Sequence, residues 1–156
     1  MSYSIYFLSE ADGEAERRRA VLNLLSKRGL IADEYGWINV ATEDGGTMSL
    51  SVRDDELQSF LGTEAVWFSR QLAELVFDIS RQGYDVLGDN GEHILTTDPD
   101  RVANGPDLAT VLCMTPEELY LRINEPFEDW ADFRDQVISD FDRGFVRRTL
   151  GRLLGR

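Results

Sequence analysis

Few side chains in this sequence combine into a catalytic pattern. The chain has one histidine, His93, and one cysteine, Cys113. A Ser-His-Asp or Cys-His arrangement would have to use His93, which lies beside a predicted hairpin turn, where a half-exposed strand histidine is the favoured interpretation. Cys113 stands in the apolar run Val-Leu-Cys-Met, which favours a small buried side chain over a nucleophile. One histidine and one cysteine cannot make a typical structural zinc site.

Glycine-rich and acidic segments also lack the spacing of a ligand site. The sequence contains neither G-x-x-x-x-G-K-[ST] nor G-x-G-x-x-G. The acids Asp85, Asp89 and Glu92, and the pair Asp98 and Asp100, do not follow the spacing of a calcium loop. A carboxylate pair for acid–base catalysis stays open, because 29 acidic residues produce accidental pairs, but none is distinguished. We therefore expect a non-enzymatic protein without cofactor or metal.

The chemistry that the sequence does carry is negative charge. The 156 residues include 16 Lys and Arg against 29 Asp and Glu, a net charge of -13. Five of those 16 basic residues lie in residues 143–156, which hold no acid, so residues 1–142 carry 11 basic and 29 acidic residues, or -18. Such a body disfavours nucleic acid, because phosphate binding depends on Lys and Arg. It suits either solubility alone or docking of a basic protein.

Two acidic clusters are the candidate partner-binding faces. The first lies on and beside a predicted helix around Trp130 and consists of Glu125, Glu128, Asp129, Asp132 and Asp135. The second surrounds the first predicted hairpin and consists of Glu43, Asp44, Asp54 and Asp55. Trp37 and Trp130 would be aromatic anchors for a partner if they were exposed, although we expect both in the core.

The arginine-rich segment 143–156 is the one basic part of the chain. Its Val146, Leu150, Leu153 and Leu154 fall on one helical face. Basic amphipathic segments bind membranes or partner grooves, but two glycines weaken this one as a free helix. We expect it to pack on the acidic domain of residues 1–142, with contact to an anionic partner as the alternative.

These residues are positioned by alternating strands and helices. A nearly continuous apolar run predicts a central strand over Tyr3 to Leu8, and helical periodicity predicts a helix over 11–28, capped by Ser9 and ended by Gly29. Strands over 35–40 and 47–53 flank the turn Glu-Asp-Gly-Gly and predict a hairpin.

The second half of the chain continues in the same way. A long helix is expected from a Thr63 cap to Gly83, followed by a hairpin of strands 84–87 and 93–96. Residues 98–110 have the composition of a loop. Thr115-Pro116-Glu117-Glu118 is a strong helix start, and Pro126 is expected to end that helix and open another.

The order β-α-β-β-α-β predicts an α+β domain with a ferredoxin-like core, meaning an antiparallel sheet with both helices on one face, plus an extra hairpin strand and C-terminal helices. The length suits one domain. No apolar run is long enough to span a bilayer, and the first ten residues do not resemble a signal peptide, so we expect a cytoplasmic protein.

Two short segments resemble known proteins. The start Met-Ser-Tyr-Ser-Ile-Tyr-Phe-Leu, and the stretch from Ala73 through Tyr84-Asp-Val-Leu-Gly-Asp-Asn-Gly, are similar to small acidic immunity proteins of bacterial polymorphic-toxin systems. The resemblance implies a cytosolic protein that blocks a cognate toxin by covering its active site. The alternatives are a small-ligand-binding or regulatory module with a pocket between sheet and helices, and a phage- or secretion-linked adaptor that uses the basic tail.

Overall fold

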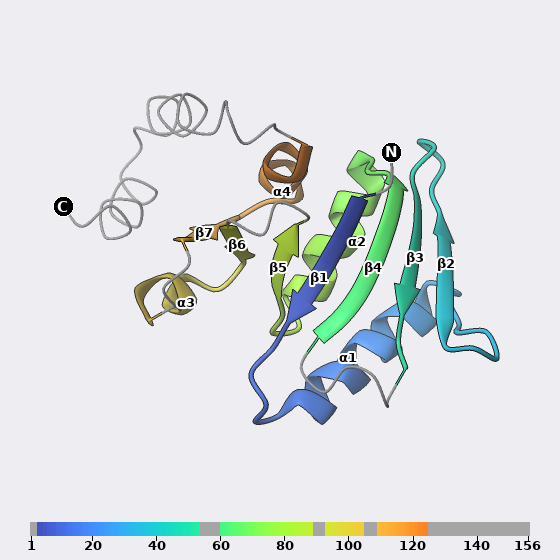
Figure 1. The fold of residues 1–156 in the computed structure, drawn as a ribbon, viewed down its shortest axis with the longest axis horizontal. Coiled ribbons are helices and arrows are strands. Elements are labelled where there is room, and N and C mark those ends of the chain that lie inside the picture. Colours follow the sequence, from blue (N-terminus) through green and yellow to red (C-terminus); the bar gives the residue numbers. More distant parts are fainter. Residues whose placement is uncertain (1–2, 54–59, 89–92, 105–108, 125–156) are drawn as a thin grey trace.

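The computed structural model describes residues 3–53, 60–88, 93–104 and 109–124. Its centre is a seven-stranded mixed sheet in the order β2-β3-β4-β1-β5-β6-β7, with helices packed against it (Figure 1). The elements in chain order are β1 (Tyr3–Leu8), α1 (Glu14–Lys27), β2 (Trp37–Ala41), β3 (Thr47–Ser51), β4 (Phe60–Trp67), α2 (Arg70–Ser80), β5 (Asp85–Gly88), β6 (His93–Thr96), α3 (Pro99–Asn104), β7 (Ala109–Leu112) and α4 (Pro116–Asn124). The predicted α+β class is confirmed.

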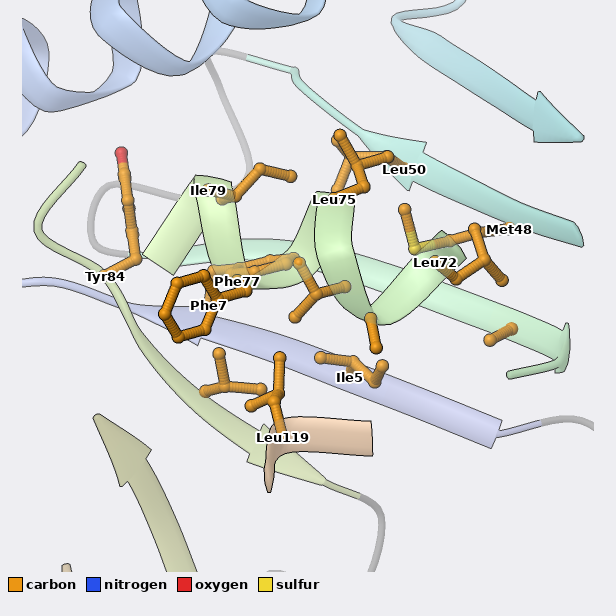
Figure 2. Close-up of a cluster of buried hydrophobic side chains, with 14 of the residues drawn as sticks. Ile5, Phe7, Met48, Leu50, Leu72, Leu75, Phe77, Ile79, Tyr84 and Leu119 are labelled. Carbon is orange, nitrogen blue, oxygen red and sulfur yellow. The ribbon is translucent and has the colours of Figure 1, made fainter. Parts of the chain in front are cut away.

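Strand β1 forms the middle of the sheet, as its apolar run predicts. It pairs antiparallel with β4 on one side and with β5 on the other. Ile5 and Phe7 are fully buried, while Tyr6 between them lies on the opposite face of the sheet and is partly exposed. The Phe7 ring meets the Tyr84 ring edge to face, with centroids 6.4 Å apart. Figure 2 shows side chains from β1, β3, α2 and α4 gathered in this core.

Helix α1 starts later than the sequence predicts, and its expected cap is wrong. Gly13 occupies the N-cap position in the left-handed conformation, without a side-chain cap. Ser9 instead accepts a hydrogen bond from Arg17 Nε at 2.6 Å, and the Arg17 guanidinium also donates to the carbonyls of Glu10 and Asp12. Arg17 thereby fixes residues 9–12 as a loop. The predicted end is confirmed, because Gly29 has a φ of 75°.

The prediction of a helix from Thr63 is wrong. Residues 60–67 form strand β4 between β1 and β3, and Thr63 donates its hydroxyl hydrogen bond to the Ser49 carbonyl at 3.0 Å. Helix α2 begins at Arg70, where the Ser69 hydroxyl accepts from the Leu72 N–H at 3.2 Å. Pairing with β3, the preceding strand, and with β1, which is distant in the sequence, decides this segment, and local periodicity does not contain that information.

The extra strand changes the topology from the predicted one. Three strands rather than two lie between α1 and α2, and β6 and β7 follow β5 at the other edge, so the order of the whole seven-stranded sheet differs from that of a four-stranded ferredoxin-like core. The two long helices do share one face of the sheet, because their buried side chains join a single core cluster and Arg28 of α1 forms an ion pair with Asp78 of α2. The predicted hairpins β2–β3 and β5–β6 are both confirmed.

Residues 98–110 are not a simple loop, because they contain α3 and the start of β7. Asp98 accepts a hydrogen bond from the Asp100 N–H at 2.9 Å and thus caps α3, with Pro99 at its first position. Strand β7 then pairs with β6 in parallel, which the crossover through α3 makes possible. Proline and aspartate at this point belong to a helix start rather than to a loop.

Helix α4 begins at Pro116 as predicted, with the Thr115 hydroxyl accepting from the Glu118 N–H at 3.2 Å. It packs on α2, where Arg70 binds the Glu117 carboxylate and lies over the Tyr120 ring. The predicted second helix after Pro126 and the arginine-rich segment 143–156 lie outside the described residues. None of the helices in the described ranges is long and apolar enough to cross a bilayer.

Candidate protein-binding face

The predicted acidic faces are only partly described by the structure. The cluster of Glu125, Glu128, Asp129, Asp132 and Asp135, together with Trp130, lies outside the described residues, as do Asp54 and Asp55. Glu43 and Asp44 are described, and both are exposed in the turn that joins β2 to β3. The geometry of the second cluster can therefore be followed at these two residues.

The Asp44 carboxylate forms hydrogen bonds with other residues of the same chain. One carboxylate oxygen accepts from the Thr42 hydroxyl at 2.6 Å, and the other accepts from the Gln71 N–H at 3.0 Å. The Thr42 hydrogen bond is the main reason that the pKa of Asp44 is lowered to about 2. Gln71 lies in the first turn of α2, which has no acidic residue of its own there, so Asp44 supplies the negative charge that stabilises a helix start.

Close packing of Gly46 holds the same turn against α2. A Cβ atom at Gly46 would lie 2.2 Å from the Ser69 hydroxyl oxygen and 2.8 Å from Leu72 Cγ. The Thr42 and Ser69 hydroxyl oxygens are 3.2 Å apart. The turn is thus docked on the N-terminus of α2, and this contact fixes the C-terminal end of β2.

A tight turn around Asp33 fixes the other end of β2. One Asp33 carboxylate oxygen accepts from the N–H groups of Tyr35 and Trp37, both at 2.9 Å, and the Asp33 N–H donates to the Trp37 carbonyl at 2.8 Å. Gly36 completes the turn with a φ of 79° and packs against Arg53. The turn leaves the Tyr35 side chain outside, 67% exposed.

The expectation that Trp37 lies in the core is wrong. Exposed and buried residues alternate along β2, with Ile38 and Val40 facing the helices and Trp37 on the opposite face, 37% exposed. The alternation in Trp-Ile-Asn-Val-Ala could have indicated this, because two β-branched residues separated by one position define the buried face. Three exposed apolar residues thus lie within residues 31–37 at the start of β2, and we treat Ile31, which is 76% exposed, Tyr35 and Trp37 as one apolar group.

Acidic side chains flank this apolar group. Asp33 and Glu34 precede β2, Glu43 follows it, and all three residues are exposed. We call the set of Ile31, Asp33, Glu34, Tyr35, Trp37 and Glu43 the β2 edge face, since β2 is the outermost of the described strands on its side of the sheet (Figure 1). Tryptophan and tyrosine are enriched among the residues that dominate binding energy in protein interfaces, which makes this face the candidate binding surface.

The residues considered for catalysis do not meet. His93 starts β6 and Cys113 follows β7, so the parallel pairing of these strands separates them by four residues, or about 13 Å. Cys113 is fully buried, and burial raises the pKa of its thiol to about 12, which keeps it protonated at neutral pH. Within the described ranges, no group of three or more His, Cys, Asp or Glu residues could hold a metal ion.

Among the described residues, buried side chains such as Ile5, Phe7 and Leu72 pack together between the sheet and the helices (Figure 2). A shallow hollow of about 430 Å³ lies elsewhere. Its lining comes from α1, from the C-cap residue of that helix and from the segment after α2: Ala20, Asn23, Leu24, Lys27, Arg28 and Gln82. No protein-family model, curated protein or solved structure matches the chain.

Proposed function

We propose that the protein is a non-enzymatic binding protein that neutralises a basic protein partner, namely an immunity protein that blocks a cognate bacterial toxin in the cytosol. The observation that carries this proposal is the exposure of Tyr35 and Trp37 at the start of β2, with exposed Asp33 and Glu34 at the same end of the strand and exposed Glu43 after its other end. The acidic residues of a -13 chain would speed and orient the approach of a basic partner.

The aromatic side chains would then hold the bound partner. Tyrosine and tryptophan offer large contact areas that lose little side-chain entropy on binding, and they are enriched among the residues that dominate binding energy. The turn around Asp33 and the docking of the β2–β3 turn on α2 fix both ends of β2 before binding. A preformed face of this kind loses little conformational freedom on association. Inhibition would follow from steric coverage of the partner's active site.

Co-expression tests this function. The wild-type protein is expected to restore growth to bacteria that express the toxin encoded beside its gene, and to co-purify with that toxin. The double variant Tyr35→Ala/Trp37→Ala is expected to lose both effects while keeping its circular dichroism spectrum. Met114→Ala is the matched control, because Met114 is an exposed apolar residue (44%) after β7, far along the sheet order from β2.

Protection by the double variant equal to that of the wild type would exclude the β2 edge face as the binding surface. Absence of protection by the wild-type protein would exclude the toxin-neutralising function itself.

A further inference from the structure

The outer edge of β2 has backbone groups that the sheet does not use. In an antiparallel pair, residues alternate between those that bond the partner strand and those whose N–H and C=O point away from it. The Thr42 N–H donates to the Gly46 carbonyl and the Val52 N–H to the Gly36 carbonyl, so residues 36 and 42 face β3. With the register Trp37↔Ser51 to Ala41↔Thr47, the outward-pointing residues are Trp37, Asn39 and Ala41.

The backbone N–H and C=O of Trp37 already form hydrogen bonds within the chain. The Asp33 carboxylate accepts from the Trp37 N–H, and the Asp33 N–H donates to the Trp37 carbonyl, so the turn closes the edge at its beginning. Among the described strands, only β3 pairs with β2, which leaves Asn39 and Ala41 on the open side. The open edge therefore extends over about 7 Å, the distance of two residues along a strand.

We propose that this edge binds a short extended segment of a basic partner, which adds a strand to the sheet beside β2 and pairs with the backbone of Asn39 and Ala41. The inference rests on the proposed function and names the binding mode and the kind of segment. Strand addition combines backbone hydrogen bonds with alternating side-chain contacts, so the side chains on both faces of the bound segment contribute to its recognition.

The two faces of β2 specify the side chains of that segment. Ile38 and Val40 point to the helical side of the sheet, so every second residue of an added strand would extend this apolar row. The residues between them would lie beside Trp37, Asn39 and Ala41 on the open face. Exposed Asp33, Glu34 and Glu43 stand at the two ends of β2 and match basic residues there. The segment is thus alternately apolar and polar, with Lys or Arg at its ends.

Charge also decides between a foreign strand and a second copy of this chain. Two copies paired through β2 would bring their acids at both ends of the strand together, in chains that each carry -13. Like charges across a strand pair are unfavourable, whereas a basic segment meets the same residues with opposite charge. The occupant is therefore a basic partner and not a second copy.

Ala41→Pro removes one outward N–H without disturbing the hairpin. Because the Ala41 N–H points away from β3, the substitution keeps the β2–β3 hydrogen bonds, and proline is tolerated on edge strands whose N–H faces solvent. Ala41→Val is the matched control, since it keeps the N–H and enlarges the side chain. Both variants are expected to retain the circular dichroism spectrum of the wild type.

The experiment selects binders from a phage-displayed library of random linear peptides, with the full-length protein as the target. We expect enrichment of alternately apolar and polar peptides with basic ends. Their affinity should fall at least about tenfold for Ala41→Pro, through the lost hydrogen bond and the obstructing ring, and stay near the wild-type value for Ala41→Val. The amide protons of Asn39 and Ala41 should exchange more slowly with solvent when a selected peptide is bound.

Three results would overturn the inference: no enrichment, equal affinity of selected peptides for Ala41→Pro and the wild type, or a wild-type dimer in light scattering that Ala41→Pro abolishes. The co-expression assay separates this inference from the proposed function. If Tyr35→Ala/Trp37→Ala loses protection against the toxin while Ala41→Pro keeps it, the inferred strand pairing is wrong and the proposed function stands. If selected peptides bind through Asn39 and Ala41 but the protein protects against no toxin, the proposed toxin-neutralising function is wrong and the strand pairing stands.

Discussion

At the scale of single residues, Asp44 shows how an exposed acid can be structural. The sequence places it in an acidic hairpin turn and predicts a partner contact. In the structure its two oxygens bind the Thr42 hydroxyl and the Gln71 N–H, which joins the turn to the start of α2. Glu43 beside it belongs to the β2 edge face. Exposure alone therefore does not separate an acid that can bind a partner from one that holds the fold.

The lowered pKa of Asp44 predicts a pH-dependent contribution to stability. The pKa of about 2 in the folded protein lies below the ordinary value of 3.8. The ionised carboxylate therefore stabilises the folded state above pH 4, and this contribution disappears as the pH falls through 2. Asp44→Ala is expected to lower the midpoint of thermal unfolding at pH 6, and the difference from the wild type should shrink between pH 4 and pH 2.

Thermal unfolding followed by circular dichroism measures this difference. Glu43→Ala is the control, because Glu43 is an exposed acid in the same turn. An Asp44→Ala midpoint that stays equally far below the wild type at pH 2 and pH 6 would show that the carboxylate charge is not the stabilising feature.

At the scale of elements, the sequence predicts what is local and misses what depends on pairing. Gly29, Thr115 and the turn at Gly45 mark boundaries that the structure confirms, because each acts through neighbouring residues. Strand β4 was not predictable from its own periodicity, since its place in the sheet depends on pairing with β1, more than 50 residues earlier in the chain, as well as with β3. The same holds for β7, which needs the crossover through α3 to pair with β6.

The candidate site divides in a similar way. The exposed position of Trp37 follows from strand alternation and was within reach of the sequence. The turn that presents Tyr35 was not, because it depends on one Asp33 oxygen accepting from two N–H groups. The open edge at Asn39 and Ala41 required the sheet order and the hydrogen-bond register, which no local pattern contains.

Helix α3 is tied to the sheet by a nearly buried carboxylate, and this contact predicts a large effect of one substitution. The Asp85 side chain on β5 is 8% exposed and accepts from Arg101 Nε at 3.0 Å and from a second guanidinium nitrogen. Arg101 also pairs with Glu10 at 2.6 Å. Arg101→Ala would leave Asp85 nearly buried without this partner and should destabilise the protein by about 3 kcal/mol.

Urea unfolding measures the effect of Arg101→Ala. The double variant Asp85→Asn/Arg101→Ala is expected to recover part of the lost stability, because it removes the buried charge together with its partner. Arg70→Ala is a control for an exposed pair, that of Arg70 with Glu117, and should change the free energy of unfolding by about 1 kcal/mol or less. Equal losses for Arg101→Ala and Arg70→Ala would contradict the argument from burial.

At the scale of the whole molecule, the acidic surface explains how an open sheet edge can persist. Unprotected edges promote aggregation, and natural sheets shorten or charge them. Here the Asp33 turn closes one end of β2, and Asp33, Glu34 and Glu43 charge both ends. In the proposed binding mode, the charges that disfavour pairing with a second copy would also attract a basic segment, so one set of residues would both prevent self-pairing and select the partner.

This arrangement predicts that the acidic charges set the association rate of the partner and that the aromatic contact sets its dissociation rate. With the partner that co-expression identifies, surface plasmon resonance of the double variant Glu34→Lys/Glu43→Lys should show an association rate lowered by about tenfold at low salt. The difference from the wild type should disappear near 1 M salt, where charges are screened within about 3 Å. Trp37→Ala should instead raise the dissociation rate and leave the association rate nearly unchanged, because its contact forms only after docking. An association rate of the wild type that is independent of salt would remove the role of the acidic surface and leave the aromatic residues as the whole basis of recognition.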